Sequence, residues 1–394
     1  MRILIAPDKF KGSLEAADVA AHLAAGLRQV APALEVNVLA VADGGEGTVD
    51  AALRAGFLAV EVPAAGPLGD PVRAQIAVGS APWASFATPQ DRIGVVEMAA
   101  ASGLAALPRD ASSSLLLAPL TATSRGTGDM VRAALAADCT LVVLGVGGSA
   151  GTDGGAGMIS ALGARLLDVA GDPVPGGGGG LGLLDRVDLD GLDPRVAATR
   201  FLLAADVTNP LTGTTGAAAV FGPQKGATGA EIVQLDGNLA RLRDCLIAAL
   251  GDRAGELALA PGAGAAGGVG YAALTVLGAE RRPGIDVVLE LVGLAARLAG
   301  ADLVITGEGS LDQQSLGGKT PVGVARLARG AGVPVVAVCG RTTLTRAEAE
   351  GAGFSRVYAL TDLEPDPARC MSEAGPLLQR VGSAIAATLR ITPA

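Results

Sequence analysis

The sequence has few basic residues for its length and no basic run. Its 30 lysines and arginines are outnumbered by 39 aspartates and glutamates, which gives a formal net charge of -9 at pH 7. A protein that binds a polyanion usually presents clustered lysine and arginine on its surface. The charge balance therefore excludes nucleic acid as a partner.

Closely spaced cysteines are also missing. The four cysteines are Cys139, Cys245, Cys339 and Cys370. They lie far apart in the sequence and form no CxxC motif, which excludes a disulfide framework. We expect them to be small buried hydrophobic residues in a reducing cytosol.

No apolar run is long enough, without a break, to be a membrane helix. The best candidate, residues 257–279, has no charge but is interrupted by Pro261 and several glycines. We therefore expect a loop followed by a buried helix in this segment. The N-terminus also lacks the apolar region and cleavage site of a secretory signal. These absences predict a cytoplasmic protein without membrane contact.

What the sequence does have is a high apolar content and a repeated strand-then-helix pattern. The chain has 394 residues, 50% of them hydrophobic, so two domains with sizeable cores are expected. Five short apolar strands come from the two ends of the chain, at residues 3–6, 35–41, 302–307, 333–340 and 355–361. Helical patterns separate them, which predicts an α/β fold with a flavodoxin-like, doubly wound parallel sheet.

The middle of the chain is then expected to be an inserted α/β domain with a mixed sheet. Its candidate strands are residues 72–79, 93–99, 141–146 and 200–207. Pro63 and Pro283 are taken as boundary markers. The predicted domains are residues 1–62 with 287–394, which form the flavodoxin-like part, and residues 63–286, which form the inserted part. We expect catalysis in a cleft between them.

Polar, glycine-rich turns follow the first three strands of the predicted parallel sheet. Ligands bind beyond the carboxyl ends of such strands, best where the strand order reverses. One such turn is ordinary loop chemistry, but three turns on adjacent strands favour a functional site. Their candidate side chains are Asp8, Lys11, Asp43, Glu308, Asp312 and Lys319. Carboxylates, lysines and glycine backbone are the groups that Mg²⁺-assisted phosphoryl transfer requires.

The inserted domain supplies candidates for the opposite wall of this site. Arg125 could bind a substrate carboxylate through two parallel hydrogen bonds. Ser124 and Asp153 each precede a helical pattern and fit the alternative role of a helix cap. Asp206 lies near the end of the predicted strand 200–207 and is a further candidate carboxylate for the same wall.

A second functional class, hydride transfer with NAD(P), rests on the turn after residues 141–146. The glycines Gly145 and Gly147, with Ala150 and the later Asp168, fit a dinucleotide-binding pattern. A hydroxy-acid dehydrogenase usually needs histidine for proton transfer. The single histidine, His22, lies on the polar face of a helix expected from Ser13 to Val30, so we expect it to be exposed. An NAD(P)-dependent oxidoreductase is therefore the weaker alternative.

Several stretches together resemble one family. They are residues 7–13, 42–48, 123–129, 145–155, 204–210, 221–227 and 307–325. These seven motifs, in this order, are similar to those of the bacterial type I glycerate kinases. The chain departs from the family at Ser310, where relatives often carry arginine.

The resemblance implies a two-domain enzyme that uses ATP and Mg²⁺ to phosphorylate D-glycerate. Most bacterial relatives are regarded as 2-kinases, so 2-phospho-D-glycerate is the expected product. The residues themselves do not choose between the 2- and 3-hydroxyl groups. The sequence also leaves the oligomeric state open, a homodimer included.

With this resemblance, the candidate residues receive hypothetical roles. Mg²⁺ is expected near Glu308, Asp312 and Asp43, and Lys11 and Lys319 are expected to neutralise the transferring phosphate. The nucleotide phosphates are assigned to a backbone cradle that contains Gly147, Gly148, Ser149 and Thr152.

The substrate side receives roles in the same way. D-Glycerate is expected to bind at Asp8, Ser124 and Arg125, with its carboxylate on Arg125. The hydroxyl proton is expected to pass to Asp206 or Asp153, between which the sequence does not choose.

Overall fold

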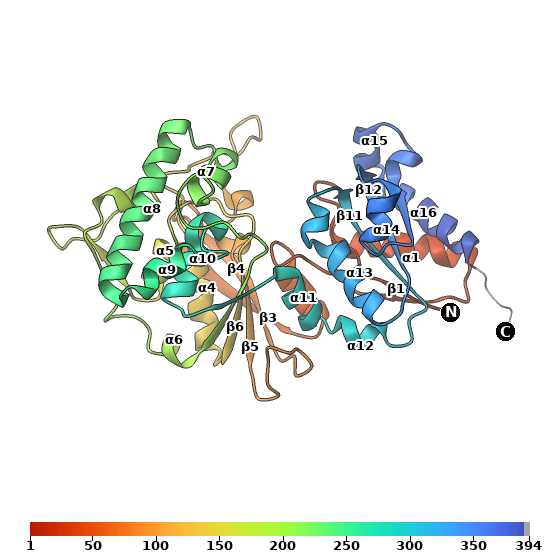
Figure 1. Ribbon diagram of the computed structural model, residues 1–394, viewed down its shortest axis with the longest axis horizontal. Helices are drawn as coiled ribbons and strands as arrows, with labels where there is room; N and C mark the ends of the chain where they lie inside the picture. Colours follow the sequence, from red (N-terminus) through yellow and green to blue (C-terminus); the bar gives the residue numbers. More distant parts are fainter. Residues whose placement is uncertain (390–394) are drawn as a thin grey trace. The chain divides into compact units, whose positions relative to one another are not determined.

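The computed structural model describes residues 1–389 and separates the chain into two units (Figure 1). Unit 1 contains Met1–Asp43, Trp83–Ser85 and the chain from Ile285 onward. Unit 2 contains Gly44–Pro82 and Phe86–Gly284. The chain passes from unit 1 to unit 2 at residues 43–44 and returns at residues 284–285. The predicted boundaries were 62–63 and 286–287, so the larger difference is at the first passage.

Unit 1 contains a five-stranded sheet in which every neighbouring pair is parallel. Its strands are β1 (Arg2–Ile5), β2 (Glu35–Val38), β11 (Leu303–Leu311), β12 (Val335–Thr342) and β13 (Arg356–Ala359). The spatial order is β13-β12-β11-β1-β2. This is the flavodoxin-like order, so the predicted sheet built from both ends of the chain is confirmed.

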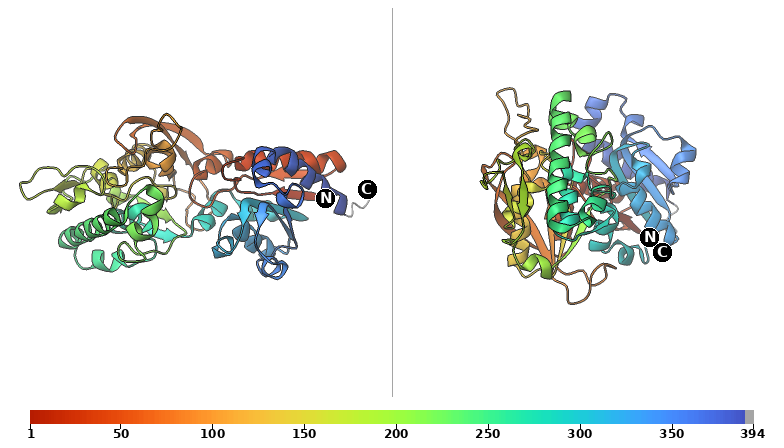
Figure 2. Two further views of the ribbon diagram at one scale, coloured as in Figure 1. Left: turned by 90° about the horizontal axis from the view of Figure 1, so that it is seen from above. Right: turned by 60° about the vertical axis from the view of Figure 1, so that its left-hand side comes forward.

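Helices cover this sheet. They are α1 (Ala16–Val30), α11 (Gly284–Leu291), α12 (Leu294–Leu298), α13 (Thr320–Gly330), α14 (Arg346–Gly351), α15 (Pro367–Ser372) and α16 (Ala374–Thr388), with short turns η4 (Ser315–Gly317) and η5 (Leu360–Asp362). Figure 2 shows α1 and α16 side by side. They approach closely at Gly26, where a Cβ would lie 2.0 Å from the Gln379 carbonyl oxygen.

Two expectations for α1 were wrong. The helix begins at Ala16 and not at Ser13, whose hydroxyl donates to the Met371 carbonyl oxygen at 2.6 Å. His22 is half-buried, and its Nδ1 lies 3.1 Å from Nε2 of Gln379. Both errors have one cause, because the C-terminal helices α15 and α16 cover this part of the chain from more than 300 residues away in sequence.

Unit 2 contains a mixed six-stranded sheet, as expected. Its strands are β3 (Leu58–Ala65), β4 (Pro71–Gly79), β5 (Ile93–Glu97), β6 (Leu141–Gly145), β9 (Arg200–Ala204) and β10 (Glu280–Arg282), in the order β10-β9-β6-β5-β4-β3. The β10, β9, β6 and β5 neighbours are parallel, whereas β5-β4 and β4-β3 are antiparallel. A separate ribbon is formed by β7 (Arg165–Leu167) and β8 (Arg186–Asp188).

The predicted boundary near Pro63 falls inside β3, where Pro63 pairs with Arg73 of β4. β3 is the edge strand of its sheet. Proline has no N–H to donate, and an edge strand tolerates this because one of its sides has no partner strand. Pro63 therefore lies within a strand of unit 2 and does not mark the crossing.

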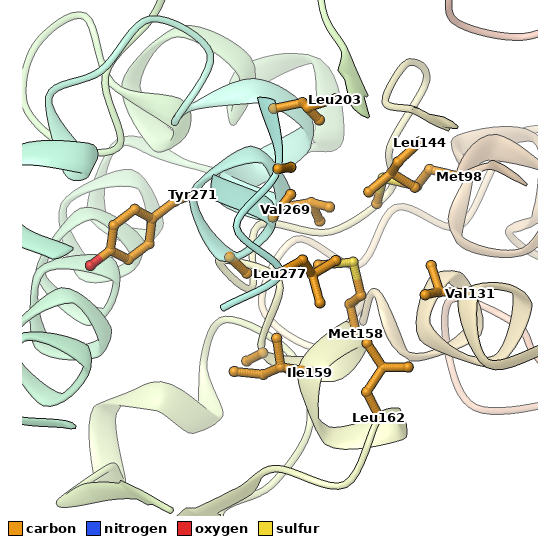
Figure 3. Close-up of a cluster of buried hydrophobic side chains, with 14 of the residues drawn as sticks. Met98, Val131, Leu144, Met158, Ile159, Leu162, Leu203, Val269, Tyr271 and Leu277 are labelled. Carbon is orange, nitrogen blue, oxygen red and sulfur yellow. The ribbon is translucent and has the colours of Figure 1, made fainter. Parts of the chain in front are cut away.

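The helices of unit 2 pack on both sides of a large apolar core. They are α2 (Thr48–Arg54), α3 (Ala99–Ser102), α4 (Arg125–Ala136), α5 (Ala156–Ala161), α6 (Arg195–Ala198), α7 (Ala217–Phe221), α8 (Gly229–Leu250), α9 (Arg253–Ala258) and α10 (Ala265–Thr275), with η1 (Leu104–Ala106), η2 (Gly180–Leu183) and η3 (Pro223–Lys225). Figure 3 shows part of this core, including Met98, Val131, Leu144 and Met158. The apolar segment 257–279 contains the turn and buried helix α10 that were expected. No helix within residues 1–389 combines the length and hydropathy of a membrane span.

Candidate active site

In unit 1, Asp8 lies beyond the carboxyl end of β1, and Glu308 lies in the second half of the adjacent strand β11, beyond the part that pairs with β1. The backbone N–H of Asp8 donates to the Gly307 carbonyl oxygen at 2.8 Å. One carboxylate oxygen of Asp8 accepts from the Thr320 hydroxyl at 2.6 Å, and the other accepts from the Lys9 N–H at 2.7 Å. Asp8 is therefore held between its own turn and the first residue of α13.

Burial, together with the neighbouring Asp43, raises the pKa of Asp8 to about 6. The bonds from Thr320 and Lys9 act in the opposite direction, as does the positive charge of Lys9. Asp8 and Asp43 are thus close enough in unit 1 to repel each other. This is one of the groupings that the sequence predicted.

Glu308 lies deeper, with 8% of its surface exposed. Burial raises its pKa to about 7; Ser315 and Lys319 act to lower this pKa, and Asp8 and Asp312 act to raise it. Its Oε1 has no hydrogen-bond partner within the described chain. The structure therefore brings Asp8, Glu308, Asp312 and Lys319 into one electrostatically coupled group.

Asp312 and Lys319 lie at the two ends of the segment that connects β11 to α13, and both charges act on Glu308. Lys319 is the N-cap residue of α13, where free N–H groups and the helix dipole favour an anion. Asp312 accepts from the Gln314 N–H at 2.9 Å and from the Ser310 hydroxyl at 3.4 Å. These bonds fix the carboxylate close to the half-buried lysine.

Lys11 lies on the turn after β1, and its side chain is exposed. Its backbone packs against β11, because a Cβ at Gly309 would lie 3.4 Å from the Lys11 nitrogen. Lys9 is half-buried and its charge acts directly on Asp8. The turn thus presents both lysines, with Lys9 the one coupled to the carboxylates.

Sequence reasoning missed Arg341. Arg341 is paired in register with Ser310, and its Nε donates to the Ser310 hydroxyl at 3.3 Å. Arg341 lies at the carboxyl end of β12, the strand next to β11. The rule that selected the turns after the first three strands would have found it if extended to the fourth.

In unit 2, the carboxyl ends of four parallel strands are aligned at one edge of the sheet. Glu97 of β5 pairs with Gly145, Gly145 pairs with Ala204, and Ala204 pairs with Arg282. The segment that follows Gly145 is the glycine-rich loop 145–155. Its start is therefore placed at the edge where ligands of parallel sheets bind.

A second glycine motif lies against this loop. A Cβ at Gly145 would be 2.6 Å from the Gly44 carbonyl oxygen, and a Cβ at Gly147 would be 2.8 Å from the Gly45 Cα. Only glycine permits this approach. The turn 43–48 was expected to belong wholly to the flavodoxin-like domain, but only Asp43 lies in unit 1.

Glu97 was also missed by sequence reasoning. It is buried, and its Oε2 accepts from the N–H groups of Gly47 and Val49 at 3.0 and 3.3 Å. Burial raises its pKa to about 7, while those two bonds lower it and Glu46 and Asp50 raise it. Glu97 anchors the start of α2 and the glycine turn before it.

Asp153 is a buried anchor with 1% exposure. Its Oδ2 accepts from the Ser124 N–H at 2.8 Å and the Ser124 hydroxyl at 2.9 Å. Three further donors reach the carboxylate, from Thr123, Gly155 and Gly157. Asp153 therefore joins the starts of α4 and α5, and its oxygen atoms are engaged by protein donors. It is not the N-cap residue of α5, which is Gly155, and the Ser124 side chain does not cap α4.

The other predicted substrate and proton-transfer residues of unit 2 differ in exposure. Ser124 is buried, and its Oγ accepts from the Met158 N–H at 3.0 Å. Arg125, the next residue, is exposed on the first turn of α4. Asp206 is exposed after β9, and its Oδ1 accepts from the Gly284 N–H at 2.8 Å.

The four residues predicted for the nucleotide cradle divide into two pairs. Gly147 is half-buried, and Gly148 is exposed with a left-handed backbone, φ 65°. Ser149 and Thr152 are buried, and the Thr152 hydroxyl has no partner among the described residues. Only the first pair reaches the surface.

Lys225, in the turn η3, was not singled out from the sequence although it lies in the 221–227 motif. Its exposure is 1%, and its Nζ donates to the Ser149 hydroxyl at 2.7 Å and to the Gly151 carbonyl oxygen. Burial lowers its pKa to about 7, and Asp153 acts in the opposite direction. The signal that could have found it is the lysine itself, in an otherwise small and apolar motif.

The donor set of unit 1 fits a magnesium ion shared with a ligand. Across residues 1–389, no three histidine, cysteine, aspartate or glutamate side chains lie close enough to hold a metal by themselves. Mg²⁺ does not require this, because it commonly uses one or two carboxylates together with phosphate oxygens and water. The orphaned Oε1 of Glu308, beside Asp312, suits that mode.

Comparison with known proteins gives one consistent result. The family model described as "Glycerate kinase family" matches residues 3–390. The glycerate kinase of Bacillus subtilis is 42% identical and covers 99% of this chain and 98% of its own length. The glycerate 2-kinase of Escherichia coli is 43% identical over 87% of this chain and 86% of its own.

A solved structure agrees with the sequence relatives. The crystal structure assigned to a glycerate kinase 2 of Salmonella typhimurium LT2 superposes with a TM-score of 0.80 at 40% identity. The match covers 99% of this chain and 98% of that one. The resemblance seen in the motifs is confirmed, and the NAD(P)-dependent alternative has no support in these comparisons.

Proposed function

Because this chain belongs to the glycerate kinase family, we propose that it transfers the terminal phosphoryl group of ATP to D-glycerate. We place the phosphate on the 2-hydroxyl, and the name of the Escherichia coli glycerate 2-kinase supports this choice. The observation that carries the proposal is the coupled group of Asp8, Glu308, Asp312 and Lys319. Phosphoryl transfer depends on such positioned charges because its transition state is loose and highly anionic.

The carboxylates and the cations of unit 1 have separate roles in this proposal. Glu308 and Asp312 would hold Mg²⁺, with Asp8 and Asp43 nearby, and the ion supplies charge neutralisation at the phosphate. Lys319 orients phosphate oxygens through its ammonium and the N-terminus of α13. Lys11 supplies a further positive charge from the turn after β1.

The exposed residues of unit 2 act on the two substrates. Arg125 holds the glycerate carboxylate through its planar guanidinium. The loop at Gly147 and Gly148 binds nucleotide phosphate through backbone N–H groups. Asp206 accepts the hydroxyl proton, a role that its exposure supports. Asp153 is less suited to that role because five protein donors already occupy its carboxylate.

The proposal is tested by ³¹P NMR of the purified protein with D-glycerate, ATP and Mg²⁺. The expected result is a new phosphomonoester signal that grows as ADP appears. Its proton coupling separates the products, because phosphorus couples to one proton in 2-phosphoglycerate and to two in 3-phosphoglycerate. Intact ATP in the presence of D-glycerate would overturn the proposed function. The Glu308→Gln variant is the matched control for a contaminating kinase.

We also propose that the enzyme acts in the cytoplasm on small molecules and not on nucleic acid. The free cysteines Cys139, Cys245, Cys339 and Cys370 and the net charge of -9 support this setting. Light scattering coupled to gel filtration decides between a monomer and the homodimer that the sequence left open.

A further inference from the structure

We propose that Lys225 is a positioning residue for ATP, which shapes the loop 147–153 from inside unit 2 without touching the nucleotide. The inference rests on the proposed function, because that proposal assigns the loop to nucleotide phosphate. It adds a residue to which no role was assigned from the sequence. The inference also explains which contacts hold the loop backbone in a conformation that can bind an anion.

The ammonium of Lys225 joins two points of the loop. It donates to the Ser149 hydroxyl at 2.7 Å and to the Gly151 carbonyl oxygen. These residues flank Ala150, so one buried cation fixes both sides of the middle of the loop. A lysine is almost never fully buried unless its donors are satisfied in this way.

The surrounding backbone leaves the ammonium no route to solvent. A Cβ at Gly267 would lie 2.9 Å from Nζ and 2.2 Å from the Gly151 carbonyl oxygen. Three successive residues there, Ala266, Gly267 and Gly268, have left-handed backbone with φ of 53°, 69° and 93°. Glycine adopts this region readily, so the strain falls on Ala266, and the run encloses the lysine against the loop.

The loop is held by three further backbone hydrogen bonds. The Gly267 carbonyl oxygen accepts from the Gly154 N–H at 3.0 Å. On the other side, the Leu104 N–H donates to Gly148 at 2.8 Å and the Ala150 N–H donates to Ser102 at 3.0 Å. Lys225 therefore completes a clamp in which η3, α10 and the α3–η1 segment each hold the loop.

These contacts engage carbonyl oxygens of the loop and leave several of its N–H groups without a protein acceptor among the described residues. The carbonyl oxygens of Gly148 and Gly151 are turned to protein donors. By contrast, the structure records no acceptor within residues 1–389 for the N–H groups of Gly147, Gly148 and Ser149. A phosphate is repelled by carbonyl oxygens and attracted by successive free N–H groups. Holding the carbonyls inward is thus what suits this loop to a phosphate.

Asp153 is the charged group that faces Lys225, and it favours the protonated amine. Its carboxylate is already occupied by donors from the starts of α4 and α5. Together, the lysine and the aspartate connect the loop to the starts of α4 and α5. Removal of the lysine leaves Ser149 and Gly151 without this donor while the aspartate network stays in place.

The experiment compares wild type with Lys225→Met, which keeps the length of the side chain and removes its donors. Folding is checked by circular dichroism, and KM for ATP, KM for D-glycerate and kcat are measured. We expect KM for ATP to rise 10- to 100-fold with KM for D-glycerate within twofold, since hydrogen bonds to a charged group of this kind are lost. An equal change in both KM values, or no change in a folded variant, would overturn the inference.

Ser149→Ala keeps the test informative if Lys225→Met does not fold. It removes one acceptor of the ammonium and leaves the lysine in place, and we expect a three- to tenfold rise in KM for ATP. In the double variant the effects should be less than additive, because both changes break the same contact. Unchanged KM for ATP in Ser149→Ala would count against the clamp.

Calorimetric titration with ATP separates this inference from the proposed function. If wild type forms no phosphoglycerate but binds ATP at least tenfold more tightly than Lys225→Met, only the glycerate reaction is overturned. If product forms and both proteins bind ATP equally, only the role of Lys225 is overturned.

Discussion

At the scale of single residues, this protein buries several charged groups whose partners differ. Asp153 has five hydrogen-bond donors around it, whereas one oxygen of Glu308 has none within the described chain. A satisfied buried carboxylate stabilises the local fold, and an orphaned one costs free energy that a ligand can recover. This contrast distinguishes a carboxylate occupied by protein donors from one that can still accept a hydrogen bond or a cation, which their sequence motifs do not show.

Asp206→Asn tests the proposed base. Asparagine keeps an oxygen that can accept from the Gly284 N–H, so the local fold should survive. We expect kcat to fall by about 10²- to 10⁴-fold, the usual contribution of a general base, with both KM values little changed. Steady-state kinetics measures this, and a kcat close to that of wild type would remove Asp206 from the mechanism.

Lys225 also makes a prediction about stability and pH. Its pKa is lowered from 10.5 to about 7 in the folded protein, so between these values the unfolded chain binds more protons than the folded one. The free energy of unfolding should therefore rise with pH across this window, by up to about 1.4 kcal/mol per pH unit from this group. Urea unfolding at several pH values should show a smaller rise for Lys225→Met, and parallel curves would contradict the prediction.

At the scale of elements, the start of α10 has a left-handed backbone, strained at Ala266, where it meets the loop 147–153. Positions 267 and 268 of this left-handed stretch accept only glycine, because a Cβ at either position would lie within 2.9 Å of backbone atoms elsewhere in the chain. Strain of this kind persists when the surrounding contacts require it. Here the contacts are those of Lys225 and Gly154.

Gly267→Ala tests the element directly. The new Cβ would meet the Gly151 carbonyl oxygen at 2.2 Å in a backbone region that alanine disfavours. We expect a loss of about 1–3 kcal/mol in the free energy of unfolding. The matched control is Gly237→Ala on the exposed face of α8, where a Cβ meets nothing within 4 Å and a gain of about 0.5–1 kcal/mol is expected. Urea denaturation of both variants checks the opposite signs, and equal effects would argue against strain at α10.

At the scale of the whole molecule, a ligand that binds only the folded chain should stabilise it. ATP with Mg²⁺ at 100 times its dissociation constant should add about 2.7 kcal/mol to the free energy of unfolding. Differential scanning calorimetry should show a higher Tm with ATP and Mg²⁺ than with ATP and a chelator. In Glu308→Gln this difference should shrink, and an undiminished difference would argue against Glu308 as a metal-holding residue.

Much of the fold was predictable because its strands are local, apolar and separated by helical patterns. The parallel order of β1, β2, β11, β12 and β13 followed from the count of such strands at the two chain ends. The short strands β7, β8 and β10 have three residues each, too few for an apolar pattern. Pro63 misplaced the first boundary because a proline in an edge strand resembles a linker.

The candidate site was predictable in its motifs and less so in the state of its side chains. The sequence by itself determined the family, the flavodoxin-like order and the set of carboxylates and lysines that follow the strands, because these depend on short-range pattern and order. Tertiary structure alone decided that donors surround Asp153, that one Glu308 oxygen has no hydrogen-bond partner among residues 1–389, and that Lys225 is buried. The physical reason is that burial and hydrogen bonding depend on segments distant in sequence, such as Thr320 and Asp8, which are 312 residues apart.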